Sequence, residues 1–146
     1  MPSDVTRQNF MKTYMGKAPA VDDNHIIDDI AFKMNVVAKT ADYTVKIGDS
    51  GTVFTNYGCT GTSVFTLPAV ATADGCIWWF FSAAAGTFTV TAPAGTLTTF
   101  NNAAATSVSW ETGGEIIGNG FCIFSDGTKY YCMTMPAAVA ATMTVA

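Results

Sequence analysis

The fold is decided by residues 43–68, which read YTVKIGDSGTVFTNYGCTGTSVFTLP. Apolar and polar side chains alternate within short runs, as they do in β-strands that bury one face. Glycine, asparagine and aspartate separate the runs, and Pro68, which cannot donate to a β-ladder, ends the last one. The predicted strands of this stretch are Tyr43–Ile47, Thr52–Thr55 and Ser63–Leu67.

The same pattern of short strands continues to the C-terminal part of the chain. Turn signals recur every eight to twelve residues or so, which is typical of a β-sandwich or barrel. We therefore expect an all-β domain over residues 42–146, an antiparallel sandwich or barrel of about ten strands, with threonine at outward positions. The further strands expected are Ile77–Ser82, Thr87–Thr91, Leu97–Phe100, Ser107–Trp110, Glu115–Ile117, Phe121–Phe124 and Lys129–Thr134.

One expected hairpin tests whether two cysteines can form a disulfide. With Asp126-Gly127 as its two turn residues, Ser125 would face Thr128, Cys122 would face Tyr131, and Cys132 would face Phe121. Cys122 and Cys132 would then lie on opposite faces of the sheet. The other cysteines, Cys59 and Cys76, form no CxxC motif, so we expect four free and mostly buried thiols.

Charge is scarce and unevenly placed along the 146 residues. Charged residues make up 12% of the chain, about half the usual fraction, and six of the seven Lys and Arg residues precede residue 50. Residues 1–41 hold most of the charge and show no clean period. We interpret them as an extended N-terminal arm that becomes ordered against a partner.

Composition excludes several classes of partner. A net charge of −4 without a basic patch disfavours nucleic acid. The longest apolar run, residues 76–81, is too short to cross a bilayer, and the N-terminus has no signal-peptide pattern. We therefore expect neither nucleic acid nor membrane as a partner.

The sequence offers little sign of a catalytic, metal-binding or phosphate-binding site. His25 lies among four aspartates and could in principle bind a metal or act as a base, but a solvated loop is the simpler interpretation. Asp49-Ser50-Gly51 lacks the remaining ligands of a calcium loop, and the glycine-rich stretches near Gly58 and Gly113 lack the setting of a phosphate loop. We expect no catalytic residues, no metal site and no cofactor, and the chain is predicted not to be an enzyme.

Aromatic side chains suggest association instead. Trp78 and Trp79 point to opposite faces of their strand, so one can fill the core while the other needs a cover. The end of the chain, residues 135–146, carries no charged side chain and is expected to lie on the domain or between subunits. The predicted subunit-interface residues are Trp78, Trp79, Phe81, Trp110, Val139 and Met143.

Residues 43–68 also resemble a pattern of tailed-phage virion proteins, in which a strand leads to D-x-G, then x-F-x-N-x-G and F-T-L-P. A glycine-marked apolar strand, here residues 75–81, and a closing D-G-T-K-Y hairpin at residue 126 follow. The likeness covers roughly residues 42–132, and the short chain with a polar arm is most similar to capsid decoration (cement) proteins.

The resemblance implies a homotrimer on the surface of the virion capsid, bound to the lattice of the major capsid protein after assembly in the host cytoplasm. From composition alone, we expect the arm to reach along neighbouring capsid subunits. The arm residues predicted to bind capsid are Arg7, Phe10, Lys12, Tyr14, Lys17, His25, Ile26 and Ile27. The alternative is a tail-fibre or baseplate module that contacts a host-surface glycan through exposed aromatic residues.

Overall fold

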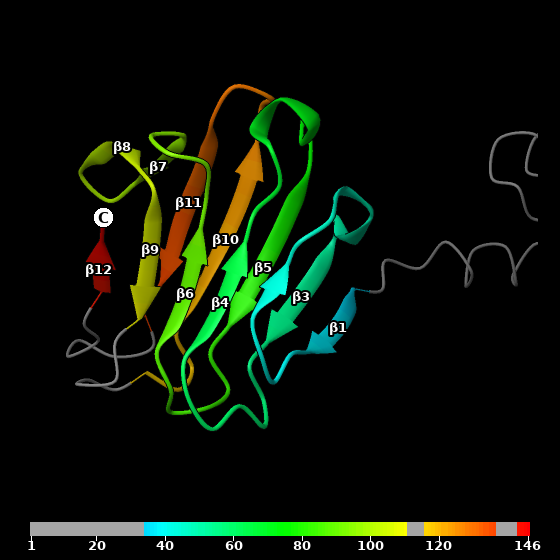
Figure 1. The fold of residues 1–146 in the computed structure, drawn as a ribbon, viewed down its shortest axis with the longest axis vertical. Helices are drawn as coiled ribbons and strands as arrows, with labels where there is room; N and C mark the ends of the chain where they lie inside the picture. The colour runs from blue at the N-terminus through cyan, green and yellow to red at the C-terminus, as the bar shows by residue number, and fades with distance from the viewer. Residues whose placement is uncertain (1–33, 111–115, 137–142) are drawn as a thin grey trace, which may run out of the picture. The chain divides into compact units, whose positions relative to one another are not determined.

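The structure, a computed structural model, describes residues 34–110, 116–136 and 143–146, which form two β-sheets packed face to face (Figure 1). The prediction of an all-β fold is confirmed, and the architecture is a sandwich of two open sheets rather than a closed barrel. The predicted arm, residues 1–41, falls outside the described residues up to position 33.

The larger sheet has seven strands in the order β1-β3-β5-β10-β11-β7-β8. Its strands are β1 (Asn35–Ala38), β3 (Thr52–Thr55), β5 (Ile77–Phe81), β7 (Leu97–Thr99), β8 (Asn102–Ala105), β10 (Gly120–Ser125) and β11 (Tyr130–Met135). The smaller sheet has the order β12-β9-β6-β4-β2. Its strands are β2 (Tyr43–Thr44), β4 (Ser63–Thr66), β6 (Phe88–Thr91), β9 (Ser107–Trp110) and β12 (Met143–Val145).

Both sheets are mixed, so the prediction of an antiparallel sandwich is wrong in this respect. The first six strands alternate between the two sheets, and β1, β3 and β5 are parallel neighbours in the larger one. In the smaller sheet β2, β4 and β6 are parallel neighbours as well. Because the chain crosses to the other sheet after each strand, it returns to the first sheet running in its original direction.

The hairpin of β10 and β11 is antiparallel, with a wider turn than predicted. Ser125 pairs with Tyr130, so residues 126–129 form a four-residue connection. The Asp126 carboxylate accepts hydrogen bonds from the backbone N–H groups of Thr128 at 2.8 Å and Lys129 at 2.7 Å, which favours this wider turn. The register is therefore shifted by two residues from the expected one.

A two-residue shift leaves every side chain on its predicted face. Cys132 pairs with the core residue Ile123, so the neighbouring Cys122 points to the outer face. The two sulfurs therefore lie on opposite faces, as predicted. All four cysteines are free, and Cys132 alone is not fully buried.

Other boundaries differ for local reasons. The strand predicted for residues 43–47 keeps only Tyr43–Thr44, and a 3-10 helix, Ile47–Asp49, follows it. The Asp49 carboxylate accepts hydrogen bonds from the Lys46 N–H at 2.8 Å and the Tyr43 hydroxyl at 3.0 Å, which stabilises that turn. Residues 116 and 117 form no strand, whereas β1, β8 and β12 were not predicted, and β1 lies within the segment assigned to the arm.

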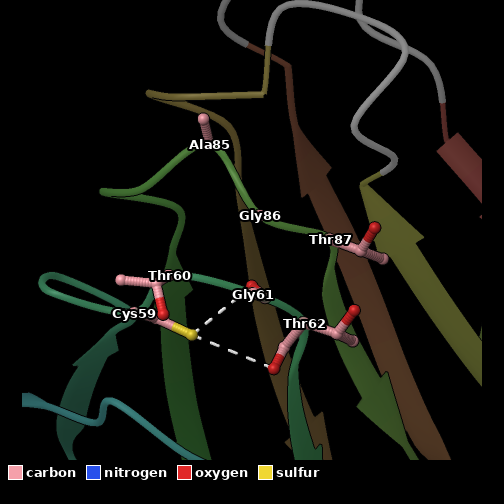
Figure 2. Close-up of a pocket in the computed structure, with 7 residues that line it drawn as sticks. All are labelled: Cys59, Thr60, Gly61, Thr62, Ala85, Gly86 and Thr87. Carbon is pink, nitrogen blue, oxygen red and sulfur yellow. Dashed lines mark hydrogen bonds between the residues drawn. The ribbon is translucent and has the colours of Figure 1, made fainter.

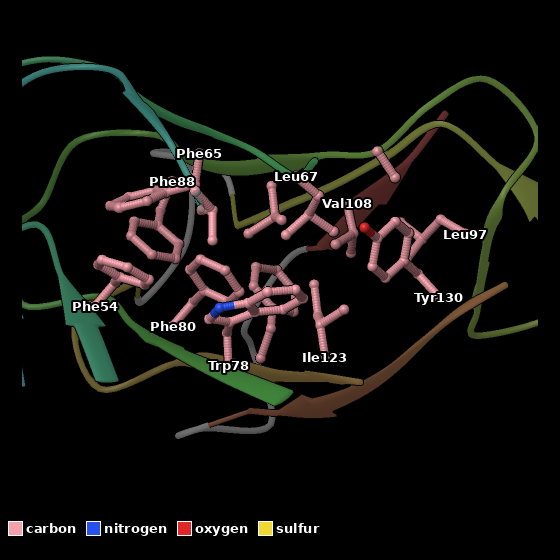
Figure 3. Close-up of a cluster of buried hydrophobic side chains, with 14 of the residues drawn as sticks. Phe54, Phe65, Leu67, Trp78, Phe80, Phe88, Leu97, Val108, Ile123 and Tyr130 are labelled. Atoms are coloured by element: carbon pink, nitrogen blue, oxygen red, sulfur yellow. The ribbon is translucent and has the colours of Figure 1, made fainter. Parts of the chain in front are cut away.

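The core lies between the inner faces of the two sheets (Figure 3). Phe54 and Phe80 of the larger sheet pack against Phe65 and Phe88 of the smaller one, with ring centroids 5.4 to 6.5 Å apart across the two sheets. Such aromatic pairs contribute about 0.5–1.5 kcal/mol each beyond the burial of their area. Trp78, Ile123 and Tyr130 extend this core toward the other end of the sandwich, as Figure 3 shows.

Candidate interaction surface

Strand β5 presents its apolar side chains to both faces of the larger sheet. Trp78 and Phe80 point into the core and are fully buried. Ile77, Trp79 and Phe81 alternate with them and point outward, and Phe81 is 43% exposed. The prediction that one tryptophan fills the core while the other needs a cover is therefore confirmed for the placement of the two side chains.

The strands beside β5 extend this apolar surface across the sheet. From the pairing registers, the outward positions align in three rows that run across the strands. We call them together the outer face: the first row is Ala38, Thr55, Phe81, Gly120 and Met135, the second is Val36, Val53, Trp79, Cys122 and Met133, and the third is Ile77, Phe124 and Tyr131.

The outer face is broad, apolar and partly open to solvent. Val36 and Met133 are exposed by 65% and 55%, and Phe81, Phe124 and Met135 are also among the exposed large hydrophobic side chains. None of its members is charged, and every charged residue in the described ranges lies in a loop, turn or 3-10 helix. Exposed apolar patches are common at sites where proteins bind other macromolecules, which makes the outer face the candidate interaction surface.

Small residues in the middle strand let the neighbouring side chains close over it. Gly120 and Cys122 of β10 are both buried although they face outward. A Cβ at Gly120 would lie 3.1 Å from the Met135 methyl carbon, so that side chain covers the glycine. Burial raises the pKa of the Cys122 thiol, which keeps it protonated and unreactive at neutral pH.

A stacked aromatic pair lies at the end of the outer face that is nearest to the β10–β11 hairpin. The Phe124 and Tyr131 rings stack with centroids 5.4 Å apart, and the Tyr131 hydroxyl donates to the Asp126 carboxylate at 2.8 Å. This hydrogen bond raises the pKa of Tyr131. The N–H groups of Lys129 and Thr128, together with the Tyr131 hydroxyl, lower the pKa of Asp126, so its charge stays in the hairpin turn at neutral pH.

The outer face of the smaller sheet has a different composition. Seven of its eight outward side chains carry a hydroxyl, and Val64 is the exception. The hydroxyl-bearing residues are Thr44, Thr66, Thr89, Thr91, Ser107, Ser109 and Thr144. Threonine at outward positions, expected for the whole domain, is therefore found mainly on this sheet.

The predicted interface residues divide between the surface and the core. Trp79 and Phe81 belong to the outer face, whereas Trp78 and Trp110 are 0% and 2% exposed in the core. Trp110 stacks on Phe121 at 5.4 Å, and its indole N–H donates to the Gly120 carbonyl at 3.3 Å, so neither buried tryptophan offers a surface to a partner.

The remaining predicted site residues add nothing to this surface. Met143 packs against the core from the smaller sheet. Val139 and the predicted arm residues from Arg7 to Ile27 lie outside the described residues, as does His25 with its neighbouring aspartates.

Sequence reasoning missed most members of the outer face. Val36, Val53, Ile77, Phe124 and Met133 were not proposed as interface residues. For Phe124 and Met133 the signal was available in the two-residue alternation of β10 and β11, where apolar side chains occupy both the inward and the outward positions. A strand that is apolar on both faces of a two-layer fold needs a cover on its second face.

A depression at one end of the smaller sheet is lined by residues 59–62 and 85–87 (Figure 2). The lining consists of small side chains, threonine hydroxyls and the Cys59 thiol, which donates to the carbonyl oxygens of Gly61 at 3.4 Å and Thr62 at 3.9 Å. Gly86 lies against Gly61 so closely that a Cβ on Gly86 would overlap the Gly61 carbonyl oxygen. The depression thus arises where two loops meet at glycines.

Within the described residues, no group of three or more His, Cys, Asp or Glu side chains could hold a metal ion. The same residues include no helix with the length and apolar character required to span a membrane. The chain matches no protein-family model, and no curated protein matches it either.

Proposed function

We propose that this chain is a structural virion protein, a homotrimer that decorates the assembled head of a tailed phage and stabilises it without catalysing a reaction. The observation that carries this proposal is the outer face of the larger sheet, which is broad, apolar and uncharged. Aromatic residues and methionine, which are enriched at protein interfaces, supply much of it. A domain with such a face is suited to work inside an assembly.

The choice of a virion among possible assemblies rests on the sequence. Residues 43–68 and the hairpin at Asp126 resemble phage structural β-domains, and a polar arm before one β-domain is most similar to a decoration protein. The two-sheet β-sandwich is compatible with that resemblance. The low charge also agrees with a protein whose surface is largely covered in use.

Stabilisation of the head would follow from mass action. A protein that binds only the assembled capsid lattice lowers the free energy of the assembled state by its binding free energy at each site. A trimer would place three arms on the lattice at once, and the local concentration of the second and third arms would raise the overall affinity. No chemical step is required.

The arm would supply the contacts with the lattice. Its basic residues Arg7, Lys12 and Lys17 would contact acidic capsid surfaces, while Phe10 and Tyr14 would add apolar contacts. Ordering of the arm upon binding would reduce the gross binding energy by an entropic cost. Because β1 begins at Asn35, the arm proper is confined to residues before the sheet.

The decisive experiment mixes the purified full-length protein with phage heads from which this protein has been genetically removed. We expect saturable co-sedimentation with the heads and improved survival of the heads on heating. A triple variant, Arg7→Glu, Lys12→Glu and Lys17→Glu, should bind heads more weakly while remaining trimeric. Immunogold labelling of virions on the tail instead of the head would refute the proposal.

A second candidate is a tail-fibre or baseplate module that binds a host glycan. It is favoured by the exposed aromatic residues and by the Tyr131–Asp126 hydrogen bond, which places polar atoms beside an aromatic ring. Against it, the other outward side chains of the face are mostly aliphatic, so they leave the hydroxyl groups of a sugar without partners. Retention on host lipopolysaccharide, with no binding to heads, would support this candidate.

A further inference from the structure

The outer face restricts the chemistry of whatever covers it. A covering surface must be apolar across about four strands, and it must not bury an unpaired charge against the face. At a strand spacing of about 4.8 Å and a rise of about 3.3 Å per residue, the central four strands over six residues cover about 400 Å². The largest apolar patch on a typical monomer has a similar area, about 300–600 Å², and is often functional.

A second copy of this chain meets these conditions. Its own outer face has the same size and the same apolar character by identity. Because no charged side chain of the described ranges lies on a strand, bringing two outer faces together buries no charge from their strands. Symmetric oligomers commonly bury such a face.

We propose that copies of this chain associate through their outer faces, with three copies enclosing a common axis. This inference rests on the proposed function for the number of copies and identifies the surface that they share. The contact is centred on β5 and β10, with Trp79, Phe81 and Met133 directed toward the neighbouring copies.

The dimensions of the sheet allow this arrangement. Strands β3, β5, β10 and β11 together span about 19 Å, and three such sheets set as the sides of a triangle lie about 5–6 Å from the axis. That distance is about half the 10 Å separation of packed sheets, so outward side chains can fill the interior. Strands farther out turn away from the contact, because neighbouring strands are twisted by about 20–25°.

The two borders of the face differ in a way that suits a closed ring. Along β3 the outward residues are Val53 and Thr55, whereas along β11 they are the larger Tyr131, Met133 and Met135. In a threefold ring the β11 border of one copy meets the β3 border of the next. Large side chains then pack against smaller ones at every junction.

The test measures the mass of the full-length protein in solution, by light scattering coupled to size-exclusion chromatography and by sedimentation velocity. The wild type should have three times the chain mass of 15.4 kDa. Phe81→Lys and Met133→Lys should each shift the protein to monomers, with an increase in the dissociation constant of at least tenfold. The matched control, Thr66→Lys, introduces the same charge at an exposed position on the smaller sheet and should leave the trimer intact.

A further variant guards against loss of folding. Met133→Thr removes apolar area but introduces a β-branched residue that suits a strand, and it should weaken the trimer while the far-ultraviolet circular dichroism spectrum is preserved. A monomeric wild type, a dimer, or a trimer unaffected by both lysine variants would overturn the inference. A trimer dissociated by these variants that fails to bind heads would instead overturn the proposed function alone.

Discussion

The two sheets of the sandwich share one core but present opposite surfaces. The smaller sheet shows solvent a nearly continuous layer of threonine and serine hydroxyls. The larger sheet shows methionine, tryptophan, phenylalanine, valine and isoleucine at the equivalent outward positions. Neither surface carries a charge on its strands, so the difference lies wholly in hydrogen-bonding capacity.

This difference separates solubility from association. Hydroxyl groups let a strand face water without charge, while the β-branched threonine keeps a strong preference for the extended backbone. On the outer face of the larger sheet only Thr55 and Tyr131 carry a hydroxyl, so most of that surface offers water no hydrogen-bonding group. Low overall charge alone therefore does not indicate which surface is suited to association, whereas the distribution of hydroxyl groups does.

The largest expected effect is on the free energy of unfolding, and it compares a side chain on the inner face of the larger sheet with its neighbour on the outer face. Trp78→Ala should lower the free energy of unfolding by about 3–5 kcal/mol, because it leaves a cavity in the core. Trp79→Ala should act mainly on association, so that urea unfolding loses its dependence on protein concentration. Equal effects of the two substitutions, both independent of concentration, would contradict the distinction.

A second pair of variants changes two loop glycines next to the smaller sheet and leaves the outward side chains of both sheets unaltered. Gly86→Ala should lower the free energy of unfolding by about 1–3 kcal/mol, because a Cβ there overlaps the Gly61 carbonyl oxygen. Gly61→Ala is the matched control, since a Cβ on Gly61 meets nothing within 4 Å and its φ is not positive. Thermal unfolding of both variants checks the expectation, which fails if the two midpoints fall equally.

Mild oxidation compares exposed and inward-facing methionines. In the dissociated Phe81→Lys variant, peroxide should oxidise Met133 and Met135 several times faster than Met143, which packs against the core. In the proposed wild-type oligomer this difference should shrink, because the outer face would be covered. Peptide mass spectrometry provides the measurement, and equal oxidation of Met133 in wild type and variant would mean that the face stays bare.

The smallest expected effect concerns pH at the hairpin that closes the outer face. The folded pKa of Asp126 lies below its unfolded value, near 4, because the carboxylate accepts hydrogen bonds from Lys129, Thr128 and Tyr131. Its stabilising contribution is therefore complete above about pH 4 and is lost as the pH falls through the folded pKa. Asp126→Asn should flatten this acid dependence of the unfolding midpoint, and an unchanged profile would show that other groups dominate.

The strands themselves could largely be predicted from the sequence. Thr52–Thr55 and Ser107–Trp110 agree residue for residue with β3 and β9, because alternation and flanking turn residues define them locally. The opposite placement of Trp78 and Trp79 also followed from the two-residue period. These features depend only on neighbouring residues in the chain.

The pairing of strands could not be predicted in the same way. Parallel pairs such as β3 with β5 join segments about 25 residues apart, and no turn motif signals them. The short strand β1 was missed because Asn35–Ala38 has little alternation and follows a charged segment. For the same reason the outer face, which five strands build together, could be recognised only once their registers were known.

The alternation of the first six strands between the sheets has a consequence for how the chain folds. A strand of either sheet can pair with the next strand of its own sheet only after the intervening strand has crossed to the other sheet. Loop closure must therefore precede most of the early pairings, which slows folding relative to a chain of simple hairpins. In the larger sheet β5 also pairs with β10, so this sheet can be completed only after residues 120–125 have been synthesised.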